Sequence, residues 1–336
     1  MKCLVTGATG LVGSHVVIEL LEKKYEVVAL YRSEEKKNHT LKIFSHYNKE
    51  YLFSSIHWVK GNVLDILFLE DVCKNIQHVY HCAAIVSFNK KRRNEMYKIN
   101  IEGTANVVNA CLEANVEKLC FVSSITALGT SKTEIDENTP WQNKSNPTAY
   151  SKSKYYSENE VWRGTAEGLK AIIVNPGIII GPGNWNEGSP ALFRRISEGL
   201  KFYTESSTGF VDVRDVATCM AKLMNTSIEN EKFILVSQNV SFKKVLSTIA
   251  AHINKPIPSI KATKFLVEVA WRLEWIKTLF TNKEPVLTKE SVKMATDNDT
   301  YSSKKATEFL MYRFIPIEES IENTASAFLK ETGIRK

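Results

Sequence analysis

A tyrosine and a lysine lie four residues apart in the segment Y-S-K-S-K at residues 150–154. Positions i and i+4 share one face of a helix, so the phenol of Tyr150 and the ammonium of Lys154 would be neighbours. A positive charge beside a phenol favours the ionised form and lowers its pKa below the usual value of about 10. Such a phenol can donate a proton to an alkoxide formed by hydride attack, or accept one in the reverse reaction. We therefore predict that Tyr150 and Lys154 are catalytic.

The chain contains a second pair with the same spacing, Tyr301 and Lys305, which serves as a control. No predicted strand precedes that pair, and no run of hydroxyl residues lies upstream of it. Tyr150 instead lies on the first helix after the predicted strand 117–122, which is followed by two serines, the second being Ser124. Because the carboxyl ends of parallel strands converge on the ligand crevice, we expect Ser124 to polarise the reacting oxygen of the substrate. The alternative for Tyr150 is a surface residue on a helix.

Three glycines in the pattern G-x-x-G-x-x-G follow the first predicted strand, residues 2–6, and precede a helical pattern that begins at residue 11. Backbone N–H groups and the positive end of the helix dipole at such a turn bind a pyrophosphate. The first glycine permits the tight turn, the second lets phosphate approach, and the third lets the helix lie close to the sheet. The alternative is a glycine turn that only connects strand and helix. We predict a dinucleotide site formed by Gly7, Thr9, Gly10, Leu11, Val12 and Gly13.

The second predicted strand, residues 26–31, ends without a carboxylate and is followed directly by Arg32. In sites for NAD an acidic residue at this place binds the ribose 2′-hydroxyl, whereas a nearby arginine accommodates the 2′-phosphate of NADP. A guanidinium forms strong charge-assisted hydrogen bonds to phosphate, so we predict NADP(H) in preference to NAD(H). The alternative is a solvated arginine beside Glu34 and Glu35.

The ends of the third and fourth predicted strands complete the predicted cofactor site. Asn62 can hydrogen-bond the adenine, and Val63 can form an apolar wall beside it. Ala83 and Ala84 are small enough to let the backbone pass close to the cofactor, although small residues equally suit plain packing of helix on sheet.

Asn100 is an amide within the predicted helix 94–114, which otherwise buries apolar residues. One interpretation is an asparagine that packs helix on helix. The other is a hydrogen bond, direct or through water, that positions Lys154, and on that interpretation we include Asn100 among the catalytic residues. The sequence leaves both open.

Strands and helices alternate through the first half of the chain, as in a parallel sheet with helices on both faces. We predict a doubly wound α/β Rossmann fold over residues 1–176 and a smaller, mostly helical substrate lobe over residues 177–336. Strands near 210–213 and 232–236 are candidates to return to the parallel sheet. The charged, irregular region 34–54 predicts a loop with a short helix. The other predicted strands are 2–6, 26–31, 56–60, 78–83, 117–122 and 170–174, and the predicted helices include 11–24, 65–75, 94–114 and 148–168.

The composition of the 336-residue chain, with 43% hydrophobic and 24% charged residues, is that of a globular protein with a substantial core. The net charge is +7, but basic residues are interspersed with acidic ones, so we expect no nucleic-acid partner. No apolar run approaches the ~20 residues that span a membrane, and no leader precedes the first strand, so we expect a cytoplasmic protein without an integral membrane segment.

Three further features bear on partners and metals. The amphipathic stretch 265–280 carries charges that suit a lid or packing helix better than membrane contact. The helices 94–114 and 148–168 can pair into a four-helix interface of a homodimer. The six cysteines are scattered without a C-x-x-C pair, so we expect buried, reduced cysteines and no metal site.

The glycine motif T-G-x-x-G-x-x-G at residues 6–13, together with Ser124 and Y-x-x-x-K at residues 150–154, resembles the extended short-chain dehydrogenase/reductases. The segments H-C-A-A-I-V-S-F at 81–88, K-I-N-I-E-G-T at 98–104 and F-V-D-V-R-D-V-A at 210–217 are similar to the dihydroflavonol reductase and 3β-hydroxysteroid dehydrogenase branch.

This resemblance implies a Rossmann fold, a C-terminal substrate lobe, and Ser124, Tyr150 and Lys154 as catalytic residues. It also implies contacts between the nicotinamide and the backbone of Pro176, Gly177 and Ile178. The chain departs from the family pattern at two positions, because Asn62 stands where an aspartate is usual and Arg214 stands where an acid is common.

The function predicted from these features is an NADP(H)-dependent carbonyl reductase or alcohol dehydrogenase for a small hydrophobic substrate. One alternative is a nucleotide-sugar epimerase or dehydratase; the absence of an arginine before residue 210 and of an acid after Ser124 speaks against it. A second alternative is a non-catalytic NADP-binding regulatory protein. The residues predicted to contact substrate are Phe88, Ser124, Ile125, Tyr150, Asn184 and Trp185, with further lining from 189–203.

Overall fold

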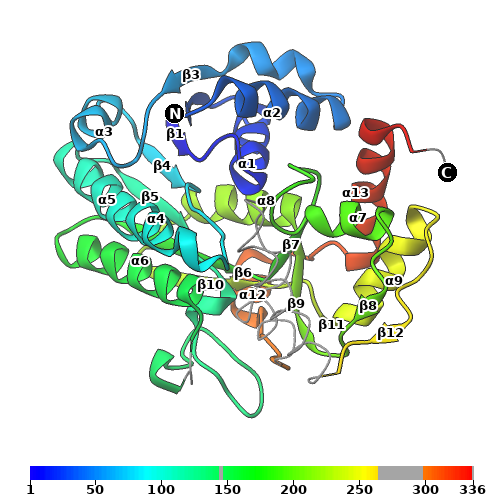
Figure 1. Ribbon diagram of the computed structural model, residues 1–336. Coiled ribbons are helices and arrows are strands. Elements are labelled where there is room, and N and C mark those ends of the chain that lie inside the picture. Colours follow the sequence, from blue (N-terminus) through cyan, green and yellow to red (C-terminus); the bar gives the residue numbers. More distant parts are fainter. Residues whose placement is uncertain (144–146, 264–297, 335–336) are drawn as a thin grey trace.

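Seven parallel strands form the central sheet, in the spatial order β10-β6-β5-β4-β1-β2-β3 (Figure 1). The computed structural model describes residues 1–143, 147–263 and 298–334. Strand order reverses between β1 and β4, which is where ligands bind in doubly wound sheets. The predicted Rossmann fold is confirmed. The strands are β1 (Lys2–Thr6), β2 (Glu26–Tyr31), β3 (His57–Lys60), β4 (His78–His81), β5 (Lys118–Val122), β6 (Ala171–Pro176) and β10 (Glu231–Leu235).

Helices cover both faces of this sheet because successive strand residues alternate between two apolar clusters. In β1, Cys3 and Val5 join the cluster under α1, α2 and α8, whereas Leu4 joins the cluster under α3, α5 and α6. All four residues of β4 and all residues of β5 and β6 are buried, as expected for strands covered on both sides. The helices are α1 (Leu11–Glu22), α2 (Glu34–His46), α3 (Ile66–Val72), α4 (Arg93–Tyr97), α5 (Gly103–Glu113), α6 (Ala149–Ala166), α8 (Val213–Met224) and α12 (Lys304–Leu310).

The remaining elements build a second layer beside the carboxyl end of the sheet. A three-stranded sheet in the order β11-β9-β7 packs with three helices around a separate apolar cluster that includes Phe193, Phe210 and Phe328. Its members are β7 (Ile178–Ile180), β9 (Ser207–Asp212), β11 (Gln238–Ser241), α7 (Ala191–Ser197), α9 (Phe242–His252) and α13 (Ile317–Thr332), and a two-stranded sheet pairs β8 (Phe202–Tyr203) with β12 (Ile260–Lys261).

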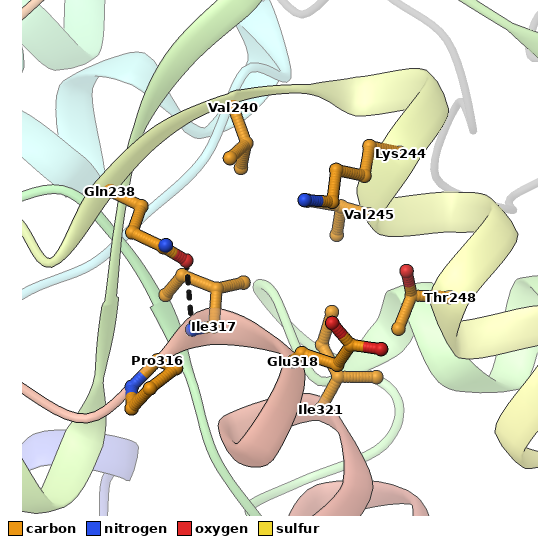
Figure 2. A pocket seen from close by; sticks show the side chains of 9 residues that line it. All are labelled: Gln238, Val240, Lys244, Val245, Thr248, Pro316, Ile317, Glu318 and Ile321. Carbon is orange, nitrogen blue, oxygen red and sulfur yellow. Dashed lines mark hydrogen bonds between the residues drawn. The ribbon is translucent and has the colours of Figure 1, made fainter.

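A small cavity of about 70 Å³ lies in this layer, between β11, α9 and α13 (Figure 2). Gln238 accepts a hydrogen bond from the backbone N–H of Ile317 at its edge, at 3.1 Å. None of the predicted site residues lines this cavity, so we regard it as a packing gap rather than a substrate site.

Three sequence predictions about elements need correction. Strand 232–236 returns to the parallel sheet as β10, but the strand near 210–213 does not, because β9 pairs with β7 and β11. Region 34–54 contains the 13-residue helix α2, which Ser33 caps and which buries Ile43 and Phe44. The predicted helix 94–114 is divided by a π-helical turn, Lys98–Glu102.

Two predictions concern membranes and a lid. No helix in the described ranges combines the length and the apolar character needed to cross a bilayer. The stretch 265–280 lies outside the described residues, so its role as a lid or packing helix stays a prediction.

Candidate active site

The glycine turn between β1 and α1 packs directly against the segment that follows β4. Gly7 has a φ of +66°, and a Cβ atom at this position would lie 2.6 Å from the backbone nitrogen of Ala83. A Cβ at Gly13 would lie 2.2 Å from the carbonyl oxygen of Gly7, so the helix can approach the strand this closely only without a side chain. Gly10 precedes α1 without a side-chain cap, which leaves N–H groups of the first turn free to bind an anion.

Tyr150 lies in the first turn of α6, and its phenol is close to Ser124, which follows the end of β5. Thr148 caps this helix by accepting a hydrogen bond from the backbone N–H of Ser151, at 3.0 Å. Burial raises the pKa of Tyr150 to about 12, and a hydrogen bond with the Ser124 hydroxyl opposes that rise. The direction is opposite to the one predicted from the neighbouring lysine, because the desolvation of the phenol outweighs the favourable interactions. Tyr150 is therefore protonated at neutral pH.

The hydroxyl of Ser124 lies beside Tyr150 and is held in place by two hydrogen bonds that it accepts. Its Oγ accepts hydrogen bonds from the backbone N–H of Thr126, at 3.2 Å, and from the hydroxyl of Thr126, at 3.0 Å. A serine hydroxyl has two lone pairs and one hydrogen, so these two bonds leave the hydrogen available. The structure thus brings the two predicted hydroxyls together, with the Ser124 proton free to point at an oxygen.

Lys154 is buried one helical turn after Tyr150. Its Nζ donates a hydrogen bond to the carbonyl of Val122, at 2.6 Å, and lies 4.5 Å from the centre of the Phe121 ring. Burial lowers the pKa of Lys154 to about 8, and the negative charge of Glu158 opposes this. The control pair differs, because Tyr301 lies in a β-bridge with Ile135 before α12 begins.

Asn100 holds the loop after β4 rather than the lysine. Its Oδ1 accepts from the backbone N–H of Ile85, at 2.8 Å, and its Nδ2 donates to the carbonyl of Ile85, at 3.0 Å, and to Ser153 Oγ, at 2.9 Å. Within the described residues no hydrogen bond joins Asn100 to Lys154. A direct hydrogen bond from Asn100 to Lys154 is therefore not supported, and the contacts of Asn100 suit the packing interpretation; a link to Lys154 through water stays a prediction.

His81 has a structural role that the sequence did not reveal. Thr104 uses its hydroxyl hydrogen to donate to the carbonyl of Asn100, at 2.5 Å, so it accepts from His81 Nε2, at 3.0 Å. Nδ1 of the neutral imidazole is then left to accept from the hydroxyl of Thr6, at 2.6 Å, and that hydroxyl accepts from the backbone N–H of Ala83. This buried chain joins the glycine strand to the turn that packs on α6. The motif H-C-A-A at the end of β4 was the available signal.

Arg32 is exposed at the end of β2 and forms no ion pair within the described residues. The neighbouring carboxylate of Glu34 is occupied, since it accepts hydrogen bonds from the Tyr31 hydroxyl, at 2.5 Å, and from Lys37 Nζ, at 3.4 Å. Those contacts lower the pKa of Glu34 and keep it ionised. The guanidinium of Arg32 is thus available to an anion at this edge of the sheet.

The remaining predicted cofactor residues lie along the same edge. Asn62 Oδ1 accepts from the backbone N–H of Leu64, at 3.2 Å, and the side chain of Val63 is buried against Gly103. Ala83 is half-buried and Ala84 is exposed, which leaves the turn accessible.

The segment after β6 offers less free backbone than predicted. Pro176 has no N–H group, and the N–H of Gly177 donates to the carbonyl of Leu235, at 3.0 Å. Ile178 begins β7 and pairs with Phe210. A cofactor would therefore meet carbonyls or side chains rather than the N–H of Gly177.

Two predicted substrate residues are buried in apolar clusters. Ile125 is buried in a fourth apolar cluster with Ile234 and Tyr301. Trp185 is buried in the third cluster, with its ring 5.1 Å from that of Phe328, and its indole N–H donates to Glu331, at 2.7 Å. The contacts of both side chains lie within apolar clusters of the protein, because apolar side chains beside a site can pack into a core; their predicted contact with substrate stays a prediction.

Of two further residues predicted to contact substrate, Phe88 lies beside Tyr150 and Asn184 stabilises a loop. The ring of Phe88 lies edge-on to Tyr150, with 6.0 Å between ring centres, so Phe88 is at the reacting group. Asn184 Oδ1 accepts from the backbone N–H of Asn186, at 3.1 Å, and stabilises its own loop.

A family model and a similar protein of known sequence both relate this chain to known enzymes. The sequence model of the NAD dependent epimerase/dehydratase family matches residues 3–236. A protein of Synechocystis named putative dihydroflavonol 4-reductase is 27% identical over 317 residues, which cover 91% of this chain and 88% of that protein.

Two solved structures share the fold over nearly the whole chain. The crystal structure of gox2253 is 29% identical, with a TM-score of 0.79 and coverage of 100% of this chain and 99% of that one. UDP-glucose 4-epimerase from Thermotoga maritima, solved with UDP-glucose, has a TM-score of 0.78 at 20% identity, with coverage of 99% and 100%, respectively. At that identity the second likeness concerns the fold alone.

Proposed function

The chain belongs to the NAD dependent epimerase/dehydratase family, and from this premise we propose that it is an NADP(H)-dependent carbonyl reductase or alcohol dehydrogenase for a small hydrophobic substrate. The observation that carries the proposal is the grouping of the Ser124 hydroxyl and the Tyr150 phenol at one place, with Lys154 buried on the same helix as Tyr150. These three groups are what hydride chemistry at a carbonyl carbon requires around the oxygen.

Tyr150 acts as the proton donor in the reductive direction. A bound nicotinamide nucleotide supplies the hydride, and the substrate oxygen then gains negative charge that must be neutralised. Since its pKa is about 12, the phenol holds its proton at neutral pH and can release it to a more basic alkoxide. Ser124 donates its free hydrogen to the same oxygen, which stabilises the charge as it develops.

Lys154 contributes a positive charge one helical turn after Tyr150. With a pKa of about 8 it is mostly protonated at neutral pH. Its Nζ has three donors, of which one is used by the carbonyl of Val122, so donors remain for the ribose of a cofactor. We assign it the two roles of holding the ribose and stabilising the ionised phenol in the oxidative direction.

The preference for NADP(H) rests on Arg32. The end of β2 presents this exposed guanidinium, while the carboxylate of Glu34, two residues on, is engaged by Tyr31 and Lys37. The charge of Arg32 also acts on Glu95, but that carboxylate is paired with Arg92, at 3.0 Å. A 2′-phosphate would find a cation at the end of β2. The cytoplasmic location and a homodimer through helices 94–114 and 148–168 stay predictions.

Nucleotide-sugar chemistry is less well supported by the same residues. A dehydratase needs acid–base groups beside the catalytic hydroxyl, but Ser124 is followed by Ile125 and Thr126, and Thr126 hydrogen-bonds Ser124. The protein named as a putative dihydroflavonol 4-reductase is a relative on the reductase side.

The proposal is tested with purified protein by following NADPH oxidation with aldehydes, ketones, flavanonols and ketosteroids. The products formed from UDP-hexoses are analysed separately, because their epimerisation or dehydration consumes no NADPH. We expect turnover with at least one hydrophobic carbonyl compound and none with UDP-hexoses. Turnover confined to the sugar nucleotides would overturn the reductase assignment. Binding of NADPH without turnover of any class would favour the non-catalytic alternative.

A further inference from the structure

A buried carboxylate, Glu158, lies one helical turn after Lys154 on α6. The residue is 3% exposed, although its side chain is a carboxylic acid and no metal-ligand set surrounds it within the described residues. Burying a carboxylate is unfavourable unless hydrogen bonds or an opposite charge compensate it. Its surroundings therefore indicate what it does.

The carboxylate joins the catalytic helix to the ends of two strands. Glu158 Oε1 accepts hydrogen bonds from the hydroxyl of Ser123 and from Asn175 Nδ2, the latter at 2.6 Å. Asn175 Nδ2 also donates to the carbonyl of Ser124, at 3.0 Å. Glu158 is thus linked through one amide to the residue whose hydroxyl contacts Tyr150.

The carboxylate of Glu158 and the ammonium of Lys154 also interact through their charges. Burial raises the pKa of Glu158, while the contacts with Ser123, Lys232, Asn175 and Lys154 lower it. For Lys154, the negative charge of Glu158 opposes the effect of burial.

The other titratable groups that face Lys154 are neutral at pH 7. Burial raises the pKa of the Cys82 thiol to about 12 and lowers the pKa of His81 to about 3. Tyr150 is likewise protonated, with a pKa of about 12. Among the described residues, Glu158 is therefore the group whose negative charge supports the Lys154 ammonium.

We propose that Glu158 is a positioning residue of the active site, which ties the helix bearing Tyr150 and Lys154 to the strand end bearing Ser124 and keeps Lys154 protonated by its charge. The proposal rests on the function proposed above. A neutral glutamine would accept the same two hydrogen bonds, so the hydrogen bonds alone do not call for a carboxylate. What a glutamine would lack is the charge next to Lys154.

The experiment compares Glu158→Gln with a matched control, Glu160→Gln. Glu160 lies on the same helix, is more exposed, and pairs with Arg163 at 2.9 Å. We expect the alkaline limb of the kcat profile, near pH 8 in the wild type, to move down by about one pH unit in E158Q. The profile of E160Q should match the wild type. Superimposable profiles of E158Q and wild type would overturn the proposal.

A second readout does not depend on turnover. The titration of Lys154 can be followed by NMR in protein labelled with ¹³C at the lysine ε-carbons, with Lys154→Met identifying its signal. The midpoint of the Lys154 titration should fall by about one pH unit in E158Q and should be the same in E160Q as in the wild type. If the wild type lacks activity but this shift occurs, the proposed function fails while the charge coupling stands. An unchanged midpoint rejects the coupling whatever the activity.

A second variant, Ser123→Ala, covers the case in which E158Q does not fold. Ser123→Ala keeps the charge of the carboxylate but removes one hydrogen bond that ties α6 to the strand end, and we expect a lower kcat with an unmoved alkaline limb. A shifted alkaline limb in S123A, or a kcat equal to that of the wild type, would contradict the proposal.

Discussion

The hydroxyl of Ser124, just after the end of β5, lies beside the phenol of Tyr150 in the first turn of α6, and its two bonds to Thr126 leave its hydrogen available. Both side chains are buried, and each is fixed by a cap, Ser124 through Thr126 and Tyr150 through Thr148. The site is therefore arranged before any ligand binds, which is the condition for electrostatic stabilisation of a transition state.

Replacing Tyr150 with phenylalanine removes the proton donor and leaves the ring. We expect Tyr150→Phe to lower kcat by about 10²–10⁴-fold, the usual contribution of general acid catalysis, while NADPH affinity changes only a few-fold. Steady-state kinetics and fluorescence titration with NADPH measure the two quantities. The matched control is Tyr155→Phe on the same helix, which should retain activity. A Tyr150→Phe enzyme with the wild-type rate would remove Tyr150 from the mechanism.

Arg32 should discriminate between the two nicotinamide nucleotides. We expect Arg32→Ala to weaken NADPH binding by ~1.5–3 kcal/mol, the value of a hydrogen bond to a charged group, and to leave NADH binding nearly unchanged. Calorimetric titration with both nucleotides makes the comparison. Lys74→Ala removes the same charge from an exposed ion pair with Asp71 and should affect neither. Equal losses for NADPH and NADH would show that Arg32 does not bind the 2′-phosphate.

The sequence was sufficient to predict the parallel sheet and the residues whose spacing indicates a chemical role, such as Tyr150 and Lys154. The predicted strands 2–6 and 26–31 agree with β1 and β2. Both are short apolar runs, and the glycine turn after the first one marks where it ends. The resemblance to extended short-chain dehydrogenase/reductases, its dihydroflavonol reductase-like branch, and the prediction of an NAD(P)-dependent enzyme are confirmed by the family match and the named relatives.

The sequence was insufficient where tertiary packing decides. Trp185 and Ile125 are apolar residues near a predicted site, and nothing in the sequence tells whether such residues line a pocket or enter a core. Asn100 and Glu158 have partners that lie far along the chain, so their bonds to Ile85 and Asn175 could not be read from local patterns. The length of helix α2 was underestimated because its exposed face is charged and only Thr40, Ile43 and Phe44 are buried.

The buried histidine His81 should make the protein less stable in acid. Burial lowers its folded pKa from 6.5 to about 3, so the unfolded chain binds a proton that the folded chain excludes. Its contribution to stability is complete above pH 6.5 and is lost as the pH falls toward 3, by about 1.4 kcal/mol per pH unit. Urea unfolding at pH 7, 6 and 5 should give a shallower pH dependence for His81→Asn than for the wild type.

The control for this measurement is His57→Asn, since His57 is exposed on β3. Its pH dependence should equal that of the wild type. Burial also lowers the pKa of His15, to about 4, so part of the acid sensitivity should persist in His81→Asn. A His81→Asn slope equal to the wild-type slope would show that the imidazole is protonated in the folded protein.

Phe88 and Trp185 should separate substrate binding from stability. Phe88 lies edge-on to Tyr150 and is half-buried, whereas Trp185 is packed against Phe328 and bonded to Glu331. We expect Phe88→Ala to raise KM for a hydrophobic substrate several-fold with little change in the unfolding midpoint. Trp185→Phe loses one hydrogen bond to a carboxylate and should cost ~1.5–3 kcal/mol of stability with KM unchanged. A raised KM in Trp185→Phe, with stability retained, would instead place the indole at the substrate.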